Sequence, residues 1–190
     1  MTEYYFTRHG ESQANVDEVF AGILDSPLTQ KGREAAKVEG DRLAQTGVSY
    51  DLILCSPLSR AKETAEIIAL AVGYPVADVI VEELLCERSF GKLAGQSWSS
   101  VPDEAADMIV QQGGESIADL THRVRRALGV VQELSLGKQS VLIVGHGTWY
   151  QMAEALLDGR EGNTFLESAN LPNNTVVEIR LEGFTNENAA

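Results

Sequence analysis

The feature that most constrains the fold is an alternation, along the whole chain, of short apolar runs with stretches of helical periodicity. Strands are expected at residues 4–7, 51–55, 76–81, 141–144 and 175–181, and helices between them. Such an alternation is typical of an α/β domain. Strands and helices built this way bury their apolar sides against each other, so the core is expected between a sheet and its covering helices.

Four helices are expected, and three of them have recognisable buried faces. The helix at 29–45 has a face of small residues, and a second helix is expected to begin at Ser56 and Pro57 and to stop at Gly73. Ser116 is expected to cap a third helix, and a short fourth helix follows Gly147. The predicted buried faces are Gly32, Ala36, Gly40 and Leu43; Leu58, Ala61, Ala65, Ile68, Ala69 and Val72; and Ile117, Leu120, Val124, Leu128 and Val131.

The chain has 190 residues, of which 44% are hydrophobic, enough for one sizeable core. We expect a single domain over residues 1–181, followed by a loose polar tail at 182–190. Residues 95–115, rich in Ser, Gly, Gln and acidic side chains, are the candidate for a small lid insertion.

The charge balance bears on the partners. The chain has 15 Lys and Arg against 28 Asp and Glu, a net charge of −13. This balance argues against binding to nucleic acid or to an anionic membrane. An acidic protein that binds an anionic small molecule must concentrate its few cations at one site.

The cysteines and the N-terminal sequence bear on the compartment. Cys55 and Cys86 make no disulfide framework and lack the paired spacing of a zinc site, and neither is assigned a role. The first residues show no basic stretch followed by an apolar run, and no stretch approaches membrane-spanning length. We therefore expect a cytoplasmic protein.

Basic and imidazole side chains follow three of the predicted strands. Arg8 and His9 come after the first, Arg60 opens the helix after the second, and His146 comes directly after the run at 141–144. In a parallel sheet these positions lie at one edge, where ligands bind. A neutral imidazole can attack phosphorus, and guanidinium groups can hold the charge that phosphoryl transfer develops. The pattern predicts an anion site suited to phosphoryl chemistry.

The ordered motifs of the chain resemble the histidine phosphatase superfamily, which includes the cofactor-dependent phosphoglycerate mutases. The motifs are FTRHGES at 6–12 with Asn15 after it, DSPLT at 25–29, KGREA at 31–35, SPLSRAKETA at 56–65, LCERSFGKLAG at 85–95, GGES at 113–116 and VGHG at 144–147. The resemblance covers nearly the whole chain. It implies a three-layer sandwich, with a mostly parallel central sheet flanked by helices and a small lid.

The resemblance also implies roles for single residues. His9 is implied as the nucleophile that forms a phosphohistidine, and Glu87 as the general acid and base. The residues implied to hold the phosphoryl group or the substrate are Arg8, Asn15, Gly22, Arg60, Arg88, His146 and Gly147. No metal and no other cofactor is expected. Ala21 departs from the mutases, which usually have a hydroxyl residue there.

Several structural readings compete with these roles. Glu82 and Glu83 lie close enough in sequence to be confused with Glu87. Trp98 and Trp149 are expected to be packing residues. His122, in a basic stretch of the third helix, is expected on the surface.

The predicted function is hydrolysis of small-molecule phosphomonoesters. The alternatives are a phosphoglycerate mutase and a non-catalytic phosphate-binding scaffold. A mutase needs cations for a second anionic group, yet no Lys or Arg lies between Lys92 and Arg123, and that stretch carries Asp103, Glu104 and Asp107. Arg88 and Lys92 keep the mutase alternative open. The natural substrate and the oligomeric state stay open, a homodimer being one option.

Overall fold

The structure is a computed structural model and describes residues 2–100, 106–160, 162–168, 170–181 and 184. Its centre is a five-stranded sheet in the order β3-β2-β4-β1-β5. The strands are β1 (Glu3–Arg8), β2 (Leu52–Cys55), β3 (Ile80–Val81), β4 (Ser140–Gly145) and β5 (Val176–Ile179). Only β5 pairs antiparallel, with β1, while the other neighbours pair parallel.

The parallel strands bring their carboxyl ends to one edge. Arg8 at the end of β1 lies opposite Gly145 at the end of β4, and Cys55 ends β2 opposite Val144 and Val81. Residues that follow β1, β2 and β4 in sequence therefore meet at this edge, as the sequence predicts.

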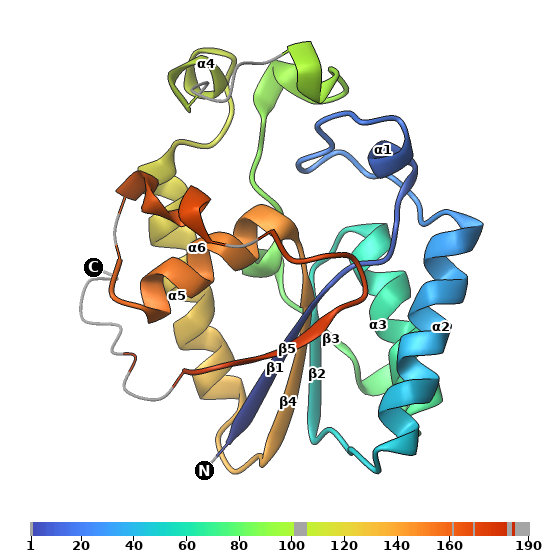
Figure 1. Ribbon diagram of the computed structural model, residues 1–190. Coiled ribbons are helices and arrows are strands. Elements are labelled where there is room, and N and C mark those ends of the chain that lie inside the picture. The colour runs from blue at the N-terminus through green and yellow to red at the C-terminus, as the bar shows by residue number, and fades with distance from the viewer. Residues whose placement is uncertain (1, 101–105, 161, 169, 182–183, 185–190) are drawn as a thin grey trace.

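Helices cover both faces of the sheet (Figure 1), so the expected α/β sandwich with a mostly parallel sheet is confirmed. On one face lie α2 (Gln30–Gln45) and α3 (Ser59–Ala71). The predicted small face of α2 is buried, and a Cβ added to Gly40 would lie 2.7 Å from the Cβ of Ala71 on α3. Small residues on α2 therefore allow this helix pair to pack closely.

The other face is covered by α5 (Ile117–Leu134) and α6 (Gly147–Leu157). The Ser116 side chain accepts a hydrogen bond from the Asp119 amide and caps α5, as the sequence predicts. Trp149 of α6 is fully buried and stacks on Phe6, with ring centroids 5.6 Å apart, which confirms its packing role.

Two sequence expectations about this sheet edge are wrong. Residues 76–81 form a 3₁₀ turn, Val76–Asp78, and only the two-residue edge strand β3, because Pro75 precedes the turn and only Ile80 and Val81 reach β2.

Helix α3 begins at Ser59, so Ser56 is not its cap. The Ser59 amide donates instead to the Asp25 carboxylate over 3.0 Å, a partner from a distant loop.

The insertion at 95–115 is tied to the rest of the chain at both ends. It contains the 3₁₀ turn Trp98–Ser100 and α4 (Ala106–Gln111), and residues 101–105 lie outside the described part. At its start, the Gly95 amide donates to the Phe20 carbonyl at 2.8 Å. At its end, the Glu115 amide donates to the Ser89 carbonyl at 2.8 Å. The expected lid is thus anchored by backbone hydrogen bonds.

The remaining elements are short. They are α1 (Gln13–Val16) and the 3₁₀ turns Glu83–Leu85, Gly91–Leu93 and Gly162–Glu167. Of the predicted loose tail, only Phe184 lies among the described residues. It packs against the core, and its carbonyl accepts a hydrogen bond from Gln132 at 3.3 Å, so at this position the tail is fixed.

Candidate active site

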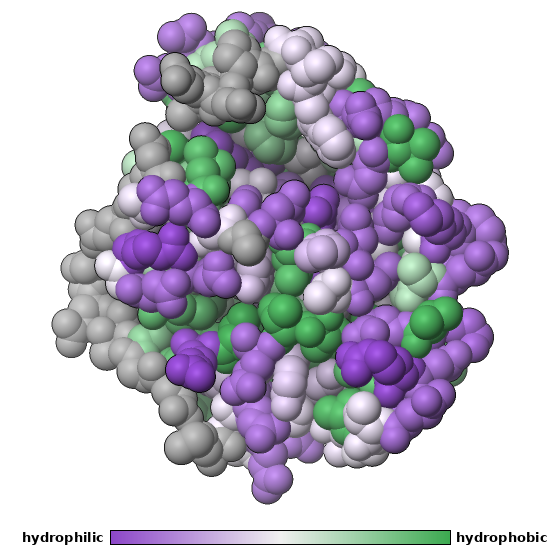
Figure 2. All heavy atoms as spheres, viewed as in Figure 1, coloured by the Kyte–Doolittle hydropathy of each residue, from purple (hydrophilic) through white to green (hydrophobic). Residues whose placement is uncertain are grey.

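A cavity of about 210 Å³ opens at the carboxyl edge of the sheet. Figure 2 shows the surface hollowed between the α4 region and the rest of the molecule. Arg8, His9, Arg60 and Glu87 lie together among its lining residues. The structure therefore brings together groups that are far apart in sequence: Arg8 and Glu87 are separated by 79 positions.

His9 is oriented by a hydrogen bond at each ring nitrogen. Its Nδ1 lies 2.7 Å from the Gly10 carbonyl, which accepts, so the ring proton is on Nδ1. The Nε2 lone pair accepts from Arg60 Nε at 3.2 Å. Burial, and then the charges of Arg60 and Arg8, hold the pKa of His9 well below its usual range. His9 is therefore neutral and has its unprotonated nitrogen beside a guanidinium.

Arg60 is fixed by the loop that carries Gly22. Its Nη1 donates to the Leu24 carbonyl at 3.0 Å and its Nη2 to the Gly22 carbonyl at 2.7 Å. Gly22 has a φ of +52°, and a Cβ there would lie 2.8 Å from the Arg88 carbonyl. Only glycine fits this turn, so Gly22 orients Arg60 through its backbone as well as lining the cavity.

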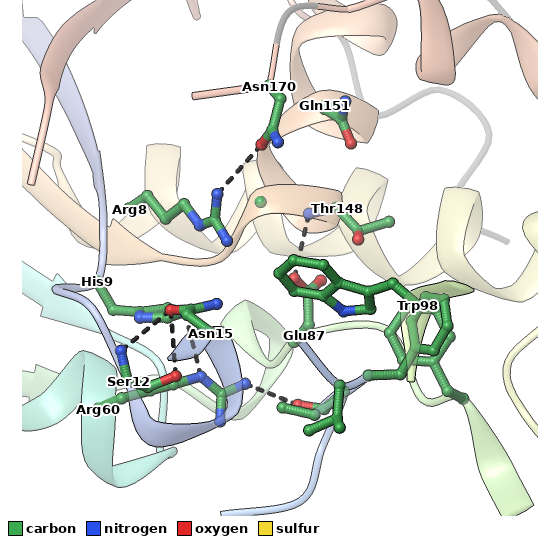
Figure 3. Close-up of a pocket in the computed structure, with 16 residues that line it drawn as sticks. Arg8, His9, Ser12, Asn15, Arg60, Glu87, Trp98, Thr148, Gln151 and Asn170 are labelled. Carbon is green, nitrogen blue, oxygen red and sulfur yellow. Dashed lines mark hydrogen bonds between the residues drawn. The ribbon is translucent and has the colours of Figure 1, made fainter. Parts of the chain in front are cut away.

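Arg8 is held by the C-terminal part of the chain. Its Nη1 donates to Asn170 Oδ1 at 3.2 Å and to the Leu171 carbonyl at 3.1 Å (Figure 3). Its Nε is buried without a partner among the described residues. A buried donor of this kind favours the binding of an anionic acceptor.

His146 lies fully buried beside His9, with the two ring centroids 5.2 Å apart. Its Nε2 is 2.7 Å from Ser56 Oγ, and Ser56 Oγ accepts from the Leu58 amide. In the tautomer with the proton on Nδ1, the His146 Nε2 accepts from the Ser56 hydroxyl. The Nδ1 atom is buried without a partner among the described residues. Burial and the Arg60 charge lower the pKa of His146 well below its usual range, so the ring is neutral.

Glu87 sits at the N-terminus of α6. Its carboxylate accepts from the backbone amides of Thr148 and Trp149, both at 3.1 Å, and of Arg88 at 2.8 Å. A helix N-terminus favours a negative charge at this position. Glu83 is exposed, and Glu82 accepts from the Leu84 amide, so of the three candidate acids only Glu87 lines the cavity.

Arg123 fixes the segment that carries Glu87, and sequence reasoning missed it. Its guanidinium makes two 2.7 Å bonds to the Glu115 carboxylate and donates to the carbonyls of Leu84 at 2.9 Å and Cys86 at 2.7 Å. A longer bond of 3.4 Å reaches the Glu87 carbonyl. One sequence signal could have indicated this role. Arg123 is next to Val124, which belongs to the buried face of α5, whereas His122 is exposed.

Comparison with known proteins decides the family. The model of the histidine phosphatase superfamily (branch 1) matches residues 4–188. The chain belongs to this superfamily. Its members are phosphatases and mutases, so this chain is an enzyme of that broad kind.

Individual relatives of this histidine phosphatase carry different names. A "Probable phosphoglycerate mutase GpmB" of Salmonella paratyphi B is 36% identical over 157 residues, covering 77% of this chain and 70% of the relative. YhfR of Bacillus stearothermophilus superposes with a TM-score of 0.82 at 29% identity, over 97% of this chain and 94% of the other. The α-ribazole phosphatase of Shigella flexneri gives 0.78 at 28%, over 94% and 90%.

The other expected site residues of this histidine phosphatase divide into two groups. Asn15 and Gly147 line the cavity, and Asn15 Oδ1 accepts from the Ser12 amide at 3.0 Å. Arg88 is not among the lining residues. It is buried, and its Nε donates to the Glu115 carbonyl at 3.0 Å.

The cavity lining also includes residues beyond the expected phosphate-binding set, and of these Trp98 lies in the predicted lid. Thr148, Gln151 and Asn170 add neutral polar groups, and Phe20, Phe90 and Trp98 add aromatic rings. Trp98 was expected to be a packing residue, yet it is 42% exposed and lines the cavity.

Among the described residues, no three His, Cys, Asp or Glu side chains are grouped as metal ligands. In the same part of the chain, no helix is long and apolar enough to cross a membrane.

Proposed function

We propose that this enzyme hydrolyses small-molecule phosphomonoesters through a phosphohistidine on His9. The observation that supports this most is the neutral ring of His9, whose unprotonated Nε2 lies beside Arg60 in a cavity that Glu87 also lines. An imidazole lone pair beside fixed guanidinium charge is suited to attack a phosphoryl group.

The reaction has two steps. In the first, Arg60 Nε releases the Nε2 lone pair of His9, which forms a bond to phosphorus; the bond from phosphorus to the ester oxygen breaks, and Glu87 in its acid form protonates the departing oxygen. In the second, the Glu87 carboxylate takes a proton from water, the water oxygen bonds to phosphorus, and the P–N bond returns its electrons to His9. Arg8, Arg60 and the Nδ1 proton of His146 stabilise the charge on the phosphoryl oxygens.

The charges of the cavity favour a phosphatase over a mutase. Of the described residues that line it, only Arg8 and Arg60 carry a fixed positive charge, and both lie beside His9. Arg88 is bonded to the Glu115 carbonyl, and exposed Lys92 does not line the cavity. A second anionic group on a mutase substrate therefore finds no further cation. The relative named a probable phosphoglycerate mutase makes mutase activity the second candidate.

The test is hydrolysis of p-nitrophenyl phosphate in excess EDTA, together with labelling of the protein that is quenched in alkaline detergent. We expect turnover in EDTA, acid-labile label on His9, and a loss of at least about a thousandfold in His9→Ala. His122→Ala, an exposed histidine on α5, is the matched control and should stay active. Full activity in a folded His9→Ala variant contradicts the nucleophile. Conversion of 3-phosphoglycerate faster than its hydrolysis supports the mutase instead.

A further inference from the structure

One wall of the cavity is aromatic. Phe20, Phe90 and Trp98, here called the aromatic rim, all line it, and the rings of Phe20 and Phe90 contact each other at a centroid distance of 4.9 Å. Trp98 is 42% exposed. Figure 3 shows Arg8, His9 and Arg60 on one side of the cavity and Trp98 on the other. The rim therefore lies where the part of a substrate beyond the phosphoryl group must extend.

The aromatic rim is held in place by backbone bonds between two loops. The amides of Phe20 and Trp98 donate to the carbonyls of Gln96 at 3.0 Å and Glu18 at 2.9 Å, and Val19 forms an antiparallel bridge with Ser97. These bonds fix the backbone that carries the rings, and a large exposed indole on a fixed backbone is a ready binding surface.

Another part of the cavity lining is polar but uncharged. It carries Thr148, Gln151 and Asn170, and the Asn170 side-chain oxygen already accepts from Arg8. The only acid that lines the cavity in the described part of the chain is Glu87, which repels a second anion. A leaving group in the cavity therefore meets apolar rings and neutral polar groups.

From this lining we infer that the aromatic rim is a leaving-group subsite for an uncharged, flat, apolar group. The substrate class is thus the phosphomonoester of an alcohol that carries an aromatic ring. A ring of this kind stacks on Trp98 or packs against the edges of Phe20 and Phe90. The inference rests on the proposed phosphatase activity and deepens it.

The test compares four esters whose leaving alcohols are all aliphatic, so that the chemistry of the leaving oxygen is similar. They are 2-phenylethyl phosphate, 2-cyclohexylethyl phosphate, glycerol 1-phosphate and 3-phosphoglycerate. We expect kcat/KM to be about tenfold higher for the phenylethyl ester than for glycerol 1-phosphate, with the cyclohexyl ester between them. 3-Phosphoglycerate should be the poorest, because its carboxylate faces Glu87 and no free cation.

Variants of Trp98 test whether the preference for the phenylethyl ester comes from the aromatic rim. In Trp98→Ala the ratio of kcat/KM between the phenylethyl ester and glycerol 1-phosphate should fall about tenfold, towards one. Trp98→Phe should keep most of the ratio, and it guards against misfolding of the alanine variant. Leu70→Ala removes a more exposed apolar side chain on α3, which is 75% exposed and does not line the cavity, and it should leave the ratio unchanged.

The outcomes separate the two proposals. If none of the four esters is hydrolysed, the phosphatase assignment itself fails. If all are hydrolysed with ratios near one, or if the ratio survives in Trp98→Ala, the phosphatase assignment stands and the aromatic subsite is wrong. A preference for 3-phosphoglycerate also overturns the subsite, because a cation must then reach the cavity.

Discussion

Glu87 both lines the cavity and binds the N-terminus of α6. Its carboxylate faces the cavity and also accepts three backbone amides at the start of α6. The proposed acid and base is therefore held in one orientation by the same bonds that begin the helix. A change at this side chain affects both the chemistry and the helix terminus.

Glu87→Gln should slow hydrolysis of alkyl phosphates by about 10²–10⁴-fold, because an amide cannot protonate the departing oxygen. Hydrolysis of p-nitrophenyl phosphate should fall much less in its first step, since that leaving group needs no proton. The amide NH₂ of the variant faces a backbone N–H of α6, so stability should drop by about 1–2 kcal/mol. Steady-state and burst kinetics with both esters, and urea unfolding, measure these effects.

The exposed Glu83→Gln is the control for this prediction and should behave like the unchanged enzyme. An equal loss for both esters indicates that Glu87 only positions the helix.

At the residue scale, the sequence predicts those site residues that follow strands. Arg8, His9 and Arg60 are where the rule for parallel sheets places them, because strand order alone fixes that edge. The rule does not reach Trp98 or Arg123. Their positions depend on contacts with the loop at 18–20 and with the segment at 84–87, which no local pattern encodes.

At the scale of elements, α5 and α6 together hold the segment that carries Glu87. Arg123 of α5 binds the carbonyls of Leu84 and Cys86, and the indole of Trp149 in α6 donates to the same Leu84 carbonyl at 3.0 Å. The segment itself contains only a 3₁₀ turn, so its shape comes from these two helices.

Arg123→Met should lower kcat/KM for alkyl phosphates more than for p-nitrophenyl phosphate, because Glu87 loses its position. It should also destabilise the protein by about 3 kcal/mol, since Glu115 is left without its partner in a mostly buried place. Kinetics with both esters and urea unfolding measure the two effects.

The double variant Glu115→Gln with Arg123→Met separates stability from positioning. It removes the unpaired charge and should regain stability without regaining the rate. Arg126→Met, on the exposed side of the same helix, is the control. Recovery of both stability and rate in the double variant contradicts a positioning role.

The elements that sequence reasoning finds are those whose periodicity is strong. Helix α5, with five fully buried residues at helical spacing, and β4, with its run of buried apolar residues, are confirmed. The wrong predictions lie at residues 56–57 and 76–81. The start of α3 depends on Asp25, which accepts a hydrogen bond from the first amide of the helix. The length of β3 depends on how many of its residues pair with β2, and only two do.

At the scale of the whole molecule, two fully buried neutral histidines make stability depend on pH. The pKa values of His9 and His146 are lowered well below 6.5 by burial and by neighbouring arginines. Below about pH 6.5 the unfolded chain therefore binds protons that the folded protein does not. Stability is lost as the pH falls below 6.5, and the loss continues until the folded-state pKa values are reached.

We expect the free energy of unfolding to fall by about 1 kcal/mol per pH unit for each histidine in this window. Urea unfolding at pH 7, 6 and 5 measures the slope. The His9→Gln, His146→Gln double variant should show a shallower slope, whereas His122→Gln, which changes an exposed side chain, should not. A flat profile in the unchanged protein contradicts neutral buried imidazoles.

The first strand of the chain depends on a segment that is synthesised long after it. The Arg8 guanidinium binds Asn170 and Leu171, the Arg8 carbonyl accepts from the Asn174 amide, and the His9 carbonyl accepts from the Asn173 side chain at 2.6 Å. Strand β1 also pairs on both sides with late strands, β4 and β5. A growing chain on the ribosome therefore carries His9 from the start, but both edges of β1 stay unpaired and open to aggregation until the last strands emerge. The contacts that hold Arg8 and His9 form only when synthesis has passed β5, so a prematurely terminated chain lacks them.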